Sequence, residues 1–401
     1  MGVVNFIPRQ REEIMSKQTL IQRVLSFSLL AVALAFSSAA ADAADPIKVG
    51  AIVSATGPAA FLGDPQEKTL HSYVDSINAS GGIAGRKIEL FIYDDSSDAA
   101  KANSFAKRLI QQDNVDFIIG ASTTGSTMAL IQLVETSKVP TLALGAGSVI
   151  VEPIRKFVFR MPHSDRLAAQ KVIEHMKRNG ITRFALLSDT GGYGKSGRNE
   201  SQKMAASMGL TIPVDETYGE RDTDMTPLLT HVKQSDAQAI LMFGTGQAPA
   251  IIAKNFSQLG MKIPLYASHG QASYEFIRLA GAAGEGMLLP SPALFVADQL
   301  PENDPQKSIS IDYKNSFEAK FKLDVSTFGG YGYDGLMMGL DAIKRAGSTD
   351  KEKVRDALEA TRGFVGISGV YNMSPTDHGG LDERAFRLVQ IKDGKFVEIA
   401  P

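Results

Sequence analysis

The sequence contains no cysteine. No disulfide can brace the fold, and no lipidated cysteine can anchor an exported form of the chain to a membrane. Long apolar runs are also missing, since none reaches the roughly 20 residues that a transmembrane helix needs. Charge of one sign is not in excess, because 42 Lys and Arg face 44 Asp and Glu. This balance, without charge runs, argues against nucleic acid or an anionic membrane surface as a partner.

The N-terminal region has the pattern of a secretory signal. Met15 opens a short basic stretch, residues 24–36 are almost wholly apolar, and small residues with A-x-A cleavage choices lead to Ala43 and Ala44. The sequence therefore predicts translation from Met15 and cleavage near Ala43 or Ala44. Residues 1–44 are assigned to this signal peptide and its upstream extension. We expect a mature protein without a lipid anchor in a bacterial periplasm.

The rest of the chain alternates strands with helices. Removal of residues 1–44 leaves 357 residues, which is too many for one compact core and suits two lobes. Strands over 47–53, 88–93 and 115–119 are each followed by a helical pattern, and the alternation restarts at 184–187. This spacing is typical of a parallel sheet with helices on both faces. The sequence predicts an α/β protein whose two lobes are joined by several strands that hinge around a cleft.

Lobe boundaries follow from where the alternation restarts and returns. We expect residues 45–162 and 288–380 to form lobe 1, because helices after residue 312 return to the first sheet. Residues 163–287 and 381–401 then form lobe 2, which the chain closes with a hairpin around Asp393 and Gly394.

Two polar turns follow neighbouring predicted strands within residues 118–148. The first has the sequence GASTTGST over residues 120–127 and precedes a helix, and the second is Gly145-Ala146-Gly147-Ser148. The unpaired N–H groups and the dipole at a helix N-terminus suit a carboxylate or phosphate. Adjacent parallel strands would present both turns at one edge, where ligands bind in open α/β folds. The alternative is that these hydroxyls only cap a helix.

Two glycine-rich turns imitate nucleotide-binding motifs. Residues 189–196 approach the Walker pattern, but Asp189 stands where the first glycine should, which would place a negative charge beside a phosphate. The turn that begins at Gly244 has Pro249 where a dinucleotide fingerprint needs its third glycine. Neither motif supports nucleotide binding.

The residue types needed for metal binding or catalysis are poorly arranged. The six histidines show no paired spacing, which with the lack of cysteine argues against zinc. Asp94, Asp95 and Asp98 could ligate a metal, but helix capping explains them better. Ser148 does not fit the G-x-S-x-G frame of a serine hydrolase. We expect no enzyme activity, no catalytic residues, no cofactor and no metal.

Several motifs together resemble the leucine/isoleucine/valine-binding type of periplasmic solute receptor for ABC transporters. They are SATGP at 54–58, INASGGIAG at 77–85, YDD at 93–95, the turn at 120–127, Ser188-Asp189 before Tyr193-Gly194, and GEGM at 284–287. The resemblance covers essentially all of the mature chain. It implies a type I periplasmic binding protein, in which two Rossmann-like lobes with parallel-sheet cores close like a Venus flytrap on a ligand. It also implies membrane permease subunits as partners, and we expect a monomer.

The resemblance assigns ligand-binding positions residue by residue. In the family, the ligand carboxylate is held by loops that here contain Thr123, Thr124 and Ala146-Gly147-Ser148, which the helix-terminus argument also selects. Tyr193 resembles the family's tyrosine after the Ser-Asp turn. A strand-end position that often carries an aromatic falls at about Gly246, and Phe61 replaces a more polar residue.

His269 departs from the pattern of the amino-acid receptors. Those proteins place an acidic residue at this position to pair the ammonium of the ligand, and a buried ammonium without a carboxylate costs several kcal/mol. We therefore expect a small, aromatic carboxylic acid as the ligand. The alternative is a branched-chain or other amino acid, with Asp189 or Glu275 supplying the charge. A ligand-sensing domain for signalling is a further alternative of the same fold.

Overall fold

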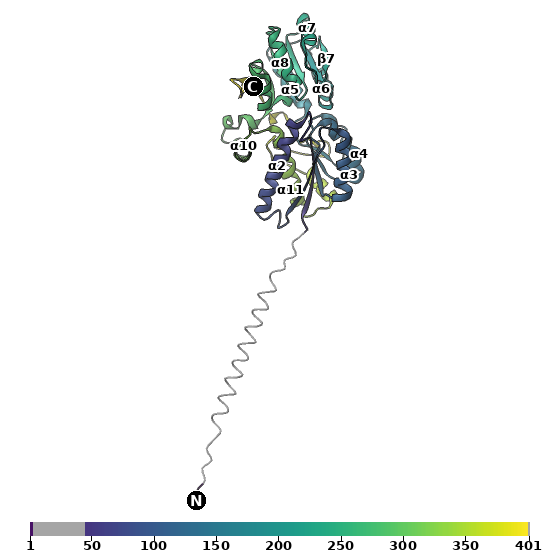
Figure 1. The fold of residues 1–401 in the computed structure, drawn as a ribbon, viewed down its shortest axis with the longest axis vertical. Helices are drawn as coiled ribbons and strands as arrows, with labels where there is room; N and C mark the ends of the chain where they lie inside the picture. Colours follow the sequence, from purple (N-terminus) through teal and green to yellow (C-terminus); the bar gives the residue numbers. More distant parts are fainter. Residues whose placement is uncertain (3–44, 400–401) are drawn as a thin grey trace. The chain divides into compact units, whose positions relative to one another are not determined.

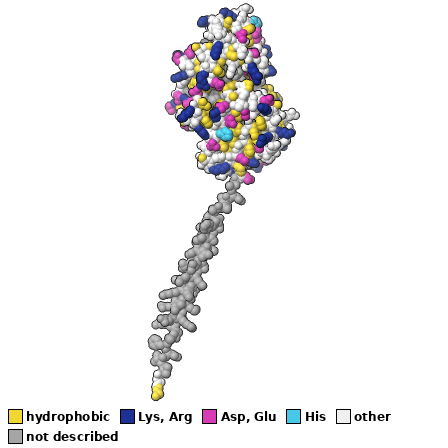
Figure 2. All heavy atoms as spheres, viewed as in Figure 1, with side chains coloured by type: hydrophobic (Ala, Val, Ile, Leu, Met, Phe, Trp, Pro, Cys, Tyr) yellow, Lys and Arg dark blue, Asp and Glu magenta, His cyan; other side chains and the backbone are white. Residues whose placement is uncertain are grey.

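The computed structural model describes residues 1–2 and 45–399, so the predicted signal peptide and its cleavage site lie outside the described residues. Residues 1–46 and 47–401 are separate units, and the second contains all the elements below. Among the described residues, no helix is both long and apolar enough for a membrane span. On the face shown in Figure 2, basic and acidic side chains are interspersed, as the balanced composition predicts.

The first lobe is built on a five-stranded parallel sheet in the order β2-β1-β3-β4-β5. Its strands are β1 (Ile47–Val53), β2 (Ile88–Asp94), β3 (Phe117–Gly120), β4 (Thr141–Ala143) and β5 (Val158–Arg160). In β1, Val49 and Ala51 face one apolar cluster while Ile52 faces another, which is the alternation expected of a strand buried on both faces. Helix α2 (Ala60–Ala79) covers one face, and α3 (Ala99–Arg108) and α4 (Thr124–Ser137) cover the other (Figure 1).

The second lobe is built on a seven-stranded sheet in the order β14-β13-β10-β9-β8-β6-β7. Five strands are parallel: β6 (Phe184–Asp189), β7 (Asp215–Tyr218), β8 (Ala239–Phe243), β9 (Leu265–Ala267) and β10 (Leu288–Pro292). The antiparallel hairpin of β13 (Phe386–Lys392) and β14 (Lys395–Glu398) forms one edge, as predicted. The helices are α5 (Asp165–Arg178), α6 (Gly192–Met208), α7 (Thr226–Gln234), α8 (Ala248–Gln258) and α9 (Tyr274–Ala280).

The chain returns to the first lobe through its long glycine-rich helix, α11 (Thr327–Ala346). It packs along α2 (Figure 1), and Gly339 allows it to lie directly against Phe117 of β3. Helix α10 (Lys307–Phe321) precedes it and contacts both lobes, because buried Tyr313 belongs to the apolar cluster of the second lobe and bonds Thr69 of α2 at 2.8 Å. Helix α12 (Lys351–Glu359) and the small hairpin of β11 (Phe364–Val365) and β12 (Val370–Tyr371) follow.

Short helical segments complete the described chain. They are a π-helical turn, η1 (Leu109–Asp113), and the 3₁₀ turns η2 (Ser148–Ile150), η3 (His269–Gln271), η4 (Gly281–Gly284), η5 (Ala293–Gln299) and η6 (Glu383–Ala385).

The structure differs from the sequence-based expectation in three ways. Strand β10, which we assigned to lobe 1, pairs with β9 and β13 in the second sheet. Helix α4 begins at Thr124, four residues earlier than predicted, because small polar residues 124–127 form its first turn rather than the preceding loop. Helix α9 was not predicted. The other lobe boundaries stay predictions.

Candidate ligand-binding site

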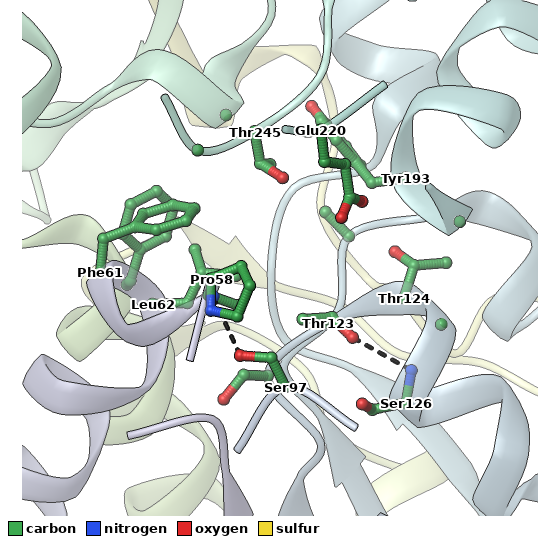
Figure 3. Close-up of a pocket in the computed structure, with 18 of the residues that line it drawn as sticks. Pro58, Phe61, Leu62, Ser97, Thr123, Thr124, Ser126, Tyr193, Glu220 and Thr245 are labelled. Carbon is green, nitrogen blue, oxygen red and sulfur yellow. Dashed lines mark hydrogen bonds between the residues drawn. The ribbon is translucent and has the colours of Figure 1, made fainter. Parts of the chain in front are cut away.

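A cavity of about 690 Å³ lies between the two lobes, at the carboxyl ends of the parallel strands. The first lobe contributes the turns after β1, β2, β3 and β4 and the start of α11. The second lobe contributes the start of α6, the turn after β7, the turn after β8 and the turn η3 after β9. Figure 3 shows the two sets of side chains converging on this space. The predicted site residues that line it are Phe61, Thr123, Thr124, Ala146, Tyr193, Gly246 and His269.

The N-terminus of α4 faces the cavity with two threonine hydroxyls. Thr123 is the N-cap of this helix, and its Oγ1 accepts a 3.0 Å hydrogen bond from the N–H of Ser126 (Figure 3). Oγ1 of Thr124 accepts a 3.1 Å hydrogen bond from the N–H of Gly147. Because both hydroxyls act as acceptors in these bonds, their hydrogens are available for donation. The N–H groups of Thr124 and Gly125 have no partner among the described residues. Capping and anion binding are therefore compatible at this helix end.

The turn after β4 approaches α4 through its glycines. A methyl group at Gly145 would lie 2.9 Å from the backbone of Thr124, and one at Gly147 would lie 2.7 Å from the Thr124 side chain. This close packing brings Ala146 to the cavity wall. Gly147 and Ser148 lie behind the wall and are not among its lining residues.

Ser148 is engaged away from the cavity. Its hydroxyl donates to Oδ1 of Asp165, which also accepts a 3.0 Å hydrogen bond from the Ser148 N–H. Burial raises the pKa of the Asp165 carboxyl, whereas the Ser148 hydroxyl lowers it. The structure thus gives this serine a partner within the protein, which the spacing of the two residues does not reveal.

Tyr193 and His269 meet on the second-lobe side of the cavity. The Tyr193 hydroxyl and Nδ1 of His269 are 3.1 Å apart, and both residues are buried. Burial lowers the pKa of His269 well below its ordinary value, and the nearby His163 and Arg160 lower it further. The imidazole is therefore neutral near pH 7 and can donate or accept one hydrogen bond at each nitrogen.

An apolar wall lies opposite these polar groups. Phe61 of α2 and Phe328 of α11 meet edge to face with their ring centroids 5.6 Å apart. Phe61 also points across the cavity toward Gly246, where a methyl group would lie 3.9 Å from its ring. Gly246 has a φ of +77°, which favours glycine. Since Gly246 carries no side chain, Phe61 supplies the ring at this part of the cavity.

Glu220 is a lining residue that the sequence analysis missed. It follows β7, and its carboxylate points into the cavity beside Thr124 and Tyr193 (Figure 3). A second carboxylate, that of Asp189, lies behind it and accepts bonds from the N–H groups of Gly191 and Thr245. Burial, and then the charge of Glu220, raises the pKa of Asp189 to about 6. Neither Asp189 nor Glu275 lines the cavity, whose acidic lining residues are Glu220 from the second lobe and Asp98 from the first.

Three aspartates at the end of β2 and just after it hold the local backbone together. Asp94, the last residue of β2, accepts from the N–H groups of Thr56 and Ser96. Asp98 caps α3 by accepting from the N–H groups of Ala100 and Lys101. Asp95 accepts from the Ser54 hydroxyl and from the N–H of Ser97. Within residues 45–399, no group of three or more acidic, histidine or cysteine side chains is arranged to hold a metal.

A two-lobed α/β architecture with a polar cavity at its strand ends defines a class of solute-binding proteins. Residues 46–395 match the family described as periplasmic binding protein, and this chain belongs to that family. Its relatives are binding proteins rather than enzymes.

Three similar proteins illustrate the relationship. The chain is 28% identical over 365 residues to the leucine-, isoleucine-, valine-, threonine- and alanine-binding protein of Pseudomonas aeruginosa, covering 90% of this chain and 92% of that protein. An extracellular ligand-binding receptor from Rhodopseudomonas palustris HaA2 has 29% identity and a TM-score of 0.83, over 89% of this chain and all of that one. A leucine-binding protein from Thermotoga maritima has the same fold, with a TM-score of 0.77 at 24% identity over 88% and 98% of the two chains.

Proposed function

We propose that this protein is the solute-binding receptor of an ABC importer and that it captures an amino acid between its two lobes. The observation that carries the proposal is the presence, in one cavity, of a helix N-terminus with two unpaired N–H groups and of a carboxylate from the other lobe. Relatives named for branched-chain amino acids support this ligand class over the aromatic acid that the sequence favoured. A periplasmic location, a membrane permease as partner and a monomeric state belong to the same proposal.

The ligand carboxylate binds at the start of α4. The N–H groups of Thr124 and Gly125, with the two threonine hydroxyls, can donate to it, and Ala146 closes the site from the side. Charge-assisted hydrogen bonds of this kind contribute about 1.5–3 kcal/mol each.

The ligand ammonium binds at Glu220. An α-amino acid carries its ammonium and its carboxylate on the same carbon atom, and Glu220 reaches the cavity from the second lobe beside the start of α4 (Figure 3). Among the described residues no salt bridge involves Glu220, although Arg221 lines the cavity next to it, so the Glu220 carboxylate can pair the ligand ammonium. Leucine, isoleucine and valine side chains fit the wall formed by Phe61, Leu62 and Phe328.

A carboxylic acid without an ammonium is the second candidate, and His269 favours it. In this position the neutral, buried imidazole cannot pair a cation as a carboxylate does. Such a ligand would leave Glu220 unused.

Thermal denaturation of the mature protein with single amino acids and with their deaminated acids tests the proposal. At a ligand concentration 100 times the Kd, binding adds about 2.7 kcal/mol of stability, which raises the melting temperature. We also expect small-angle scattering to show a smaller radius of gyration with ligand, as the lobes close. The proposal fails if no member of either set raises the melting temperature.

A further inference from the structure

One buried polar atom in the cavity wall has no role in the site described so far. It is the hydroxyl oxygen of Tyr331, in the first turns of α11. The residue is 3% exposed, and this oxygen has no hydrogen-bond partner among the described residues. The nearby hydroxyl of Thr327 acts to lower the pKa of the Tyr331 phenol, and it donates its own hydrogen to the carbonyl oxygen of Ala272, at 3.1 Å.

Three other buried hydroxyls of the cavity wall have partners within the protein. Ser122 donates to Oε1 of Gln66 at 2.5 Å and accepts from the N–H of Ser54 at 2.9 Å. The hydroxyl of Thr124 is held by Gly147, and that of Tyr193 lies 3.1 Å from His269. Buried polar groups in folded proteins nearly always have a partner, because leaving one unpaired costs free energy. Tyr331 is therefore an exception that needs an explanation.

The surroundings of Tyr331 indicate what would pair with it. Its ring centroid lies 6.1 Å from that of Phe328 in the apolar wall. It lies 6.2 Å from the ring centroid of His163, and burial lowers the pKa of His163 to about 3, which keeps this imidazole neutral. Burial raises the pKa of the Tyr331 phenol above its ordinary value, so the hydroxyl keeps its proton. A neutral hydroxyl beside neutral rings suits an uncharged polar group of the ligand better than another ionised group in addition to the ligand carboxylate.

We propose that Tyr331 is a specificity-determining residue that hydrogen-bonds an uncharged polar group, such as a hydroxyl or carbonyl, on the side chain or ring of the ligand. This inference rests on the proposed function, and it adds that the preferred ligand is not purely apolar beyond its carboxylate. A ligand that fills the apolar wall but lacks this group would leave the phenol unpaired. Sites with such buried polar groups discriminate strongly against ligands that cannot pair with them.

Calorimetry with ligand pairs that differ by one hydroxyl tests the inference. The pairs are threonine and valine, tyrosine and phenylalanine, and 3-(4-hydroxyphenyl)propionate and 3-phenylpropionate. We expect the hydroxylated member of at least one pair to bind ten-fold or more tightly than its partner. In the Tyr331→Phe protein this ratio should fall below two-fold, through loss of affinity for the hydroxylated member alone.

A matched control separates ligand recognition from folding. Tyr331→Phe removes an oxygen without a protein partner, so the ligand-free variant should melt no lower than the wild type. Tyr313→Phe removes a hydroxyl that bonds Thr69 at 2.8 Å outside the cavity. It should melt lower than the wild type and keep the wild-type ratio of affinities.

Distinct results overturn the two proposals. If the two members bind equally tightly in every pair, or if Tyr331→Phe weakens both members alike, the role of Tyr331 is wrong while the receptor function stands. A lower melting temperature for ligand-free Tyr331→Phe would also overturn it, because the hydroxyl would then have a partner within the fold. If no ligand of any pair binds and no amino acid in the screen raises the melting temperature, the proposed function fails, and this inference fails with it.

Discussion

The N–H of Gly147 donates a 3.1 Å hydrogen bond to Oγ1 of Thr124, and this bond joins the turn after β4 to the first turn of α4. It leaves the hydroxyl hydrogen of Thr124 free to reach a ligand. The same side chain therefore organises the anion site and completes it.

Thr124→Ala should weaken ligand binding by ten-fold or more, because a charge-assisted donor worth about 1.5–3 kcal/mol is lost. Thr124→Ser, which keeps the hydroxyl, should restore most of the affinity. Calorimetric titration of the wild type and the two Thr124 variants with one amino acid measures the three Kd values. Equal affinities for the Ala and Ser variants would show that the hydroxyl does not contact the ligand.

Ser148→Ala should act on stability rather than on binding. The hydroxyl of Ser148 donates to buried Asp165, and a hydrogen bond to a charged group contributes about 1.5–3 kcal/mol. We expect a lower melting temperature without ligand and less than a three-fold change in Kd. A large loss of affinity at unchanged stability would place Ser148 in the ligand site after all.

Glu220→Gln should distinguish amino acids from acids without an ammonium. The substitution removes the one negative charge that faces the cavity from the second lobe, while the shape of the side chain is kept. Leucine should lose ten-fold or more in affinity, and 4-methylpentanoate should bind as well or better. Should leucine be unaffected, Glu220 does not pair the ammonium, and the second candidate ligand class gains support.

Acid should destabilise the protein partly through His163. Burial lowers the pKa of this histidine from 6.5 to about 3, so between these values the unfolded chain binds a proton that the folded protein does not. Stability from this group is present above pH 6.5 and falls by about 2 kcal/mol on going to pH 5. Asp189 and Asp334 act in the opposite direction below pH 6, because burial raises the pKa of each to about 6.

The contribution of His163 can be isolated by comparing variants. In His163→Phe, which keeps a ring to stack on Phe386, the decrease in unfolding free energy between pH 7 and pH 5 should be smaller than in the wild type. Urea denaturation at several pH values measures both slopes. Parallel slopes would mean that His163 gains a proton in the folded state or has no shifted pKa.

Much of the architecture could be predicted because the strands are short, apolar and regularly spaced. Strands β1, β2 and β6 begin at the residues where the sequence placed them, and the C-terminal hairpin is confirmed. It was harder to predict which sheet a strand joins. The apolar sequence of β10 fits either sheet, and only its pairing with β9 and β13 shows that it belongs to the second.

Part of the candidate site could be predicted, because some of its residues lie in segments with a recognisable local sequence pattern. Thr123, Thr124 and Ala146 were found because a helix N-terminus has a local signature. Ser148 shares that signature, but its partner Asp165 is 17 residues away, and no local pattern shows the contact. Glu220 follows the edge strand β7 in an exposed turn, and Tyr331 lies within a helix, so neither carries a signal of its own. Their roles depend on how the lobes meet.

The central claim is that the start of α4 holds the carboxylate of a ligand. A comparison of two affinities tests this claim most directly. Calorimetry should compare the tightest-binding amino acid with its own carboxamide, in which the carboxylate is replaced by a neutral group and the ammonium and side chain are kept. We predict that the carboxamide binds at least 100-fold more weakly, because it offers one acceptor without charge to the N–H groups of Thr124 and Gly125. Equal binding of the two compounds would contradict the account.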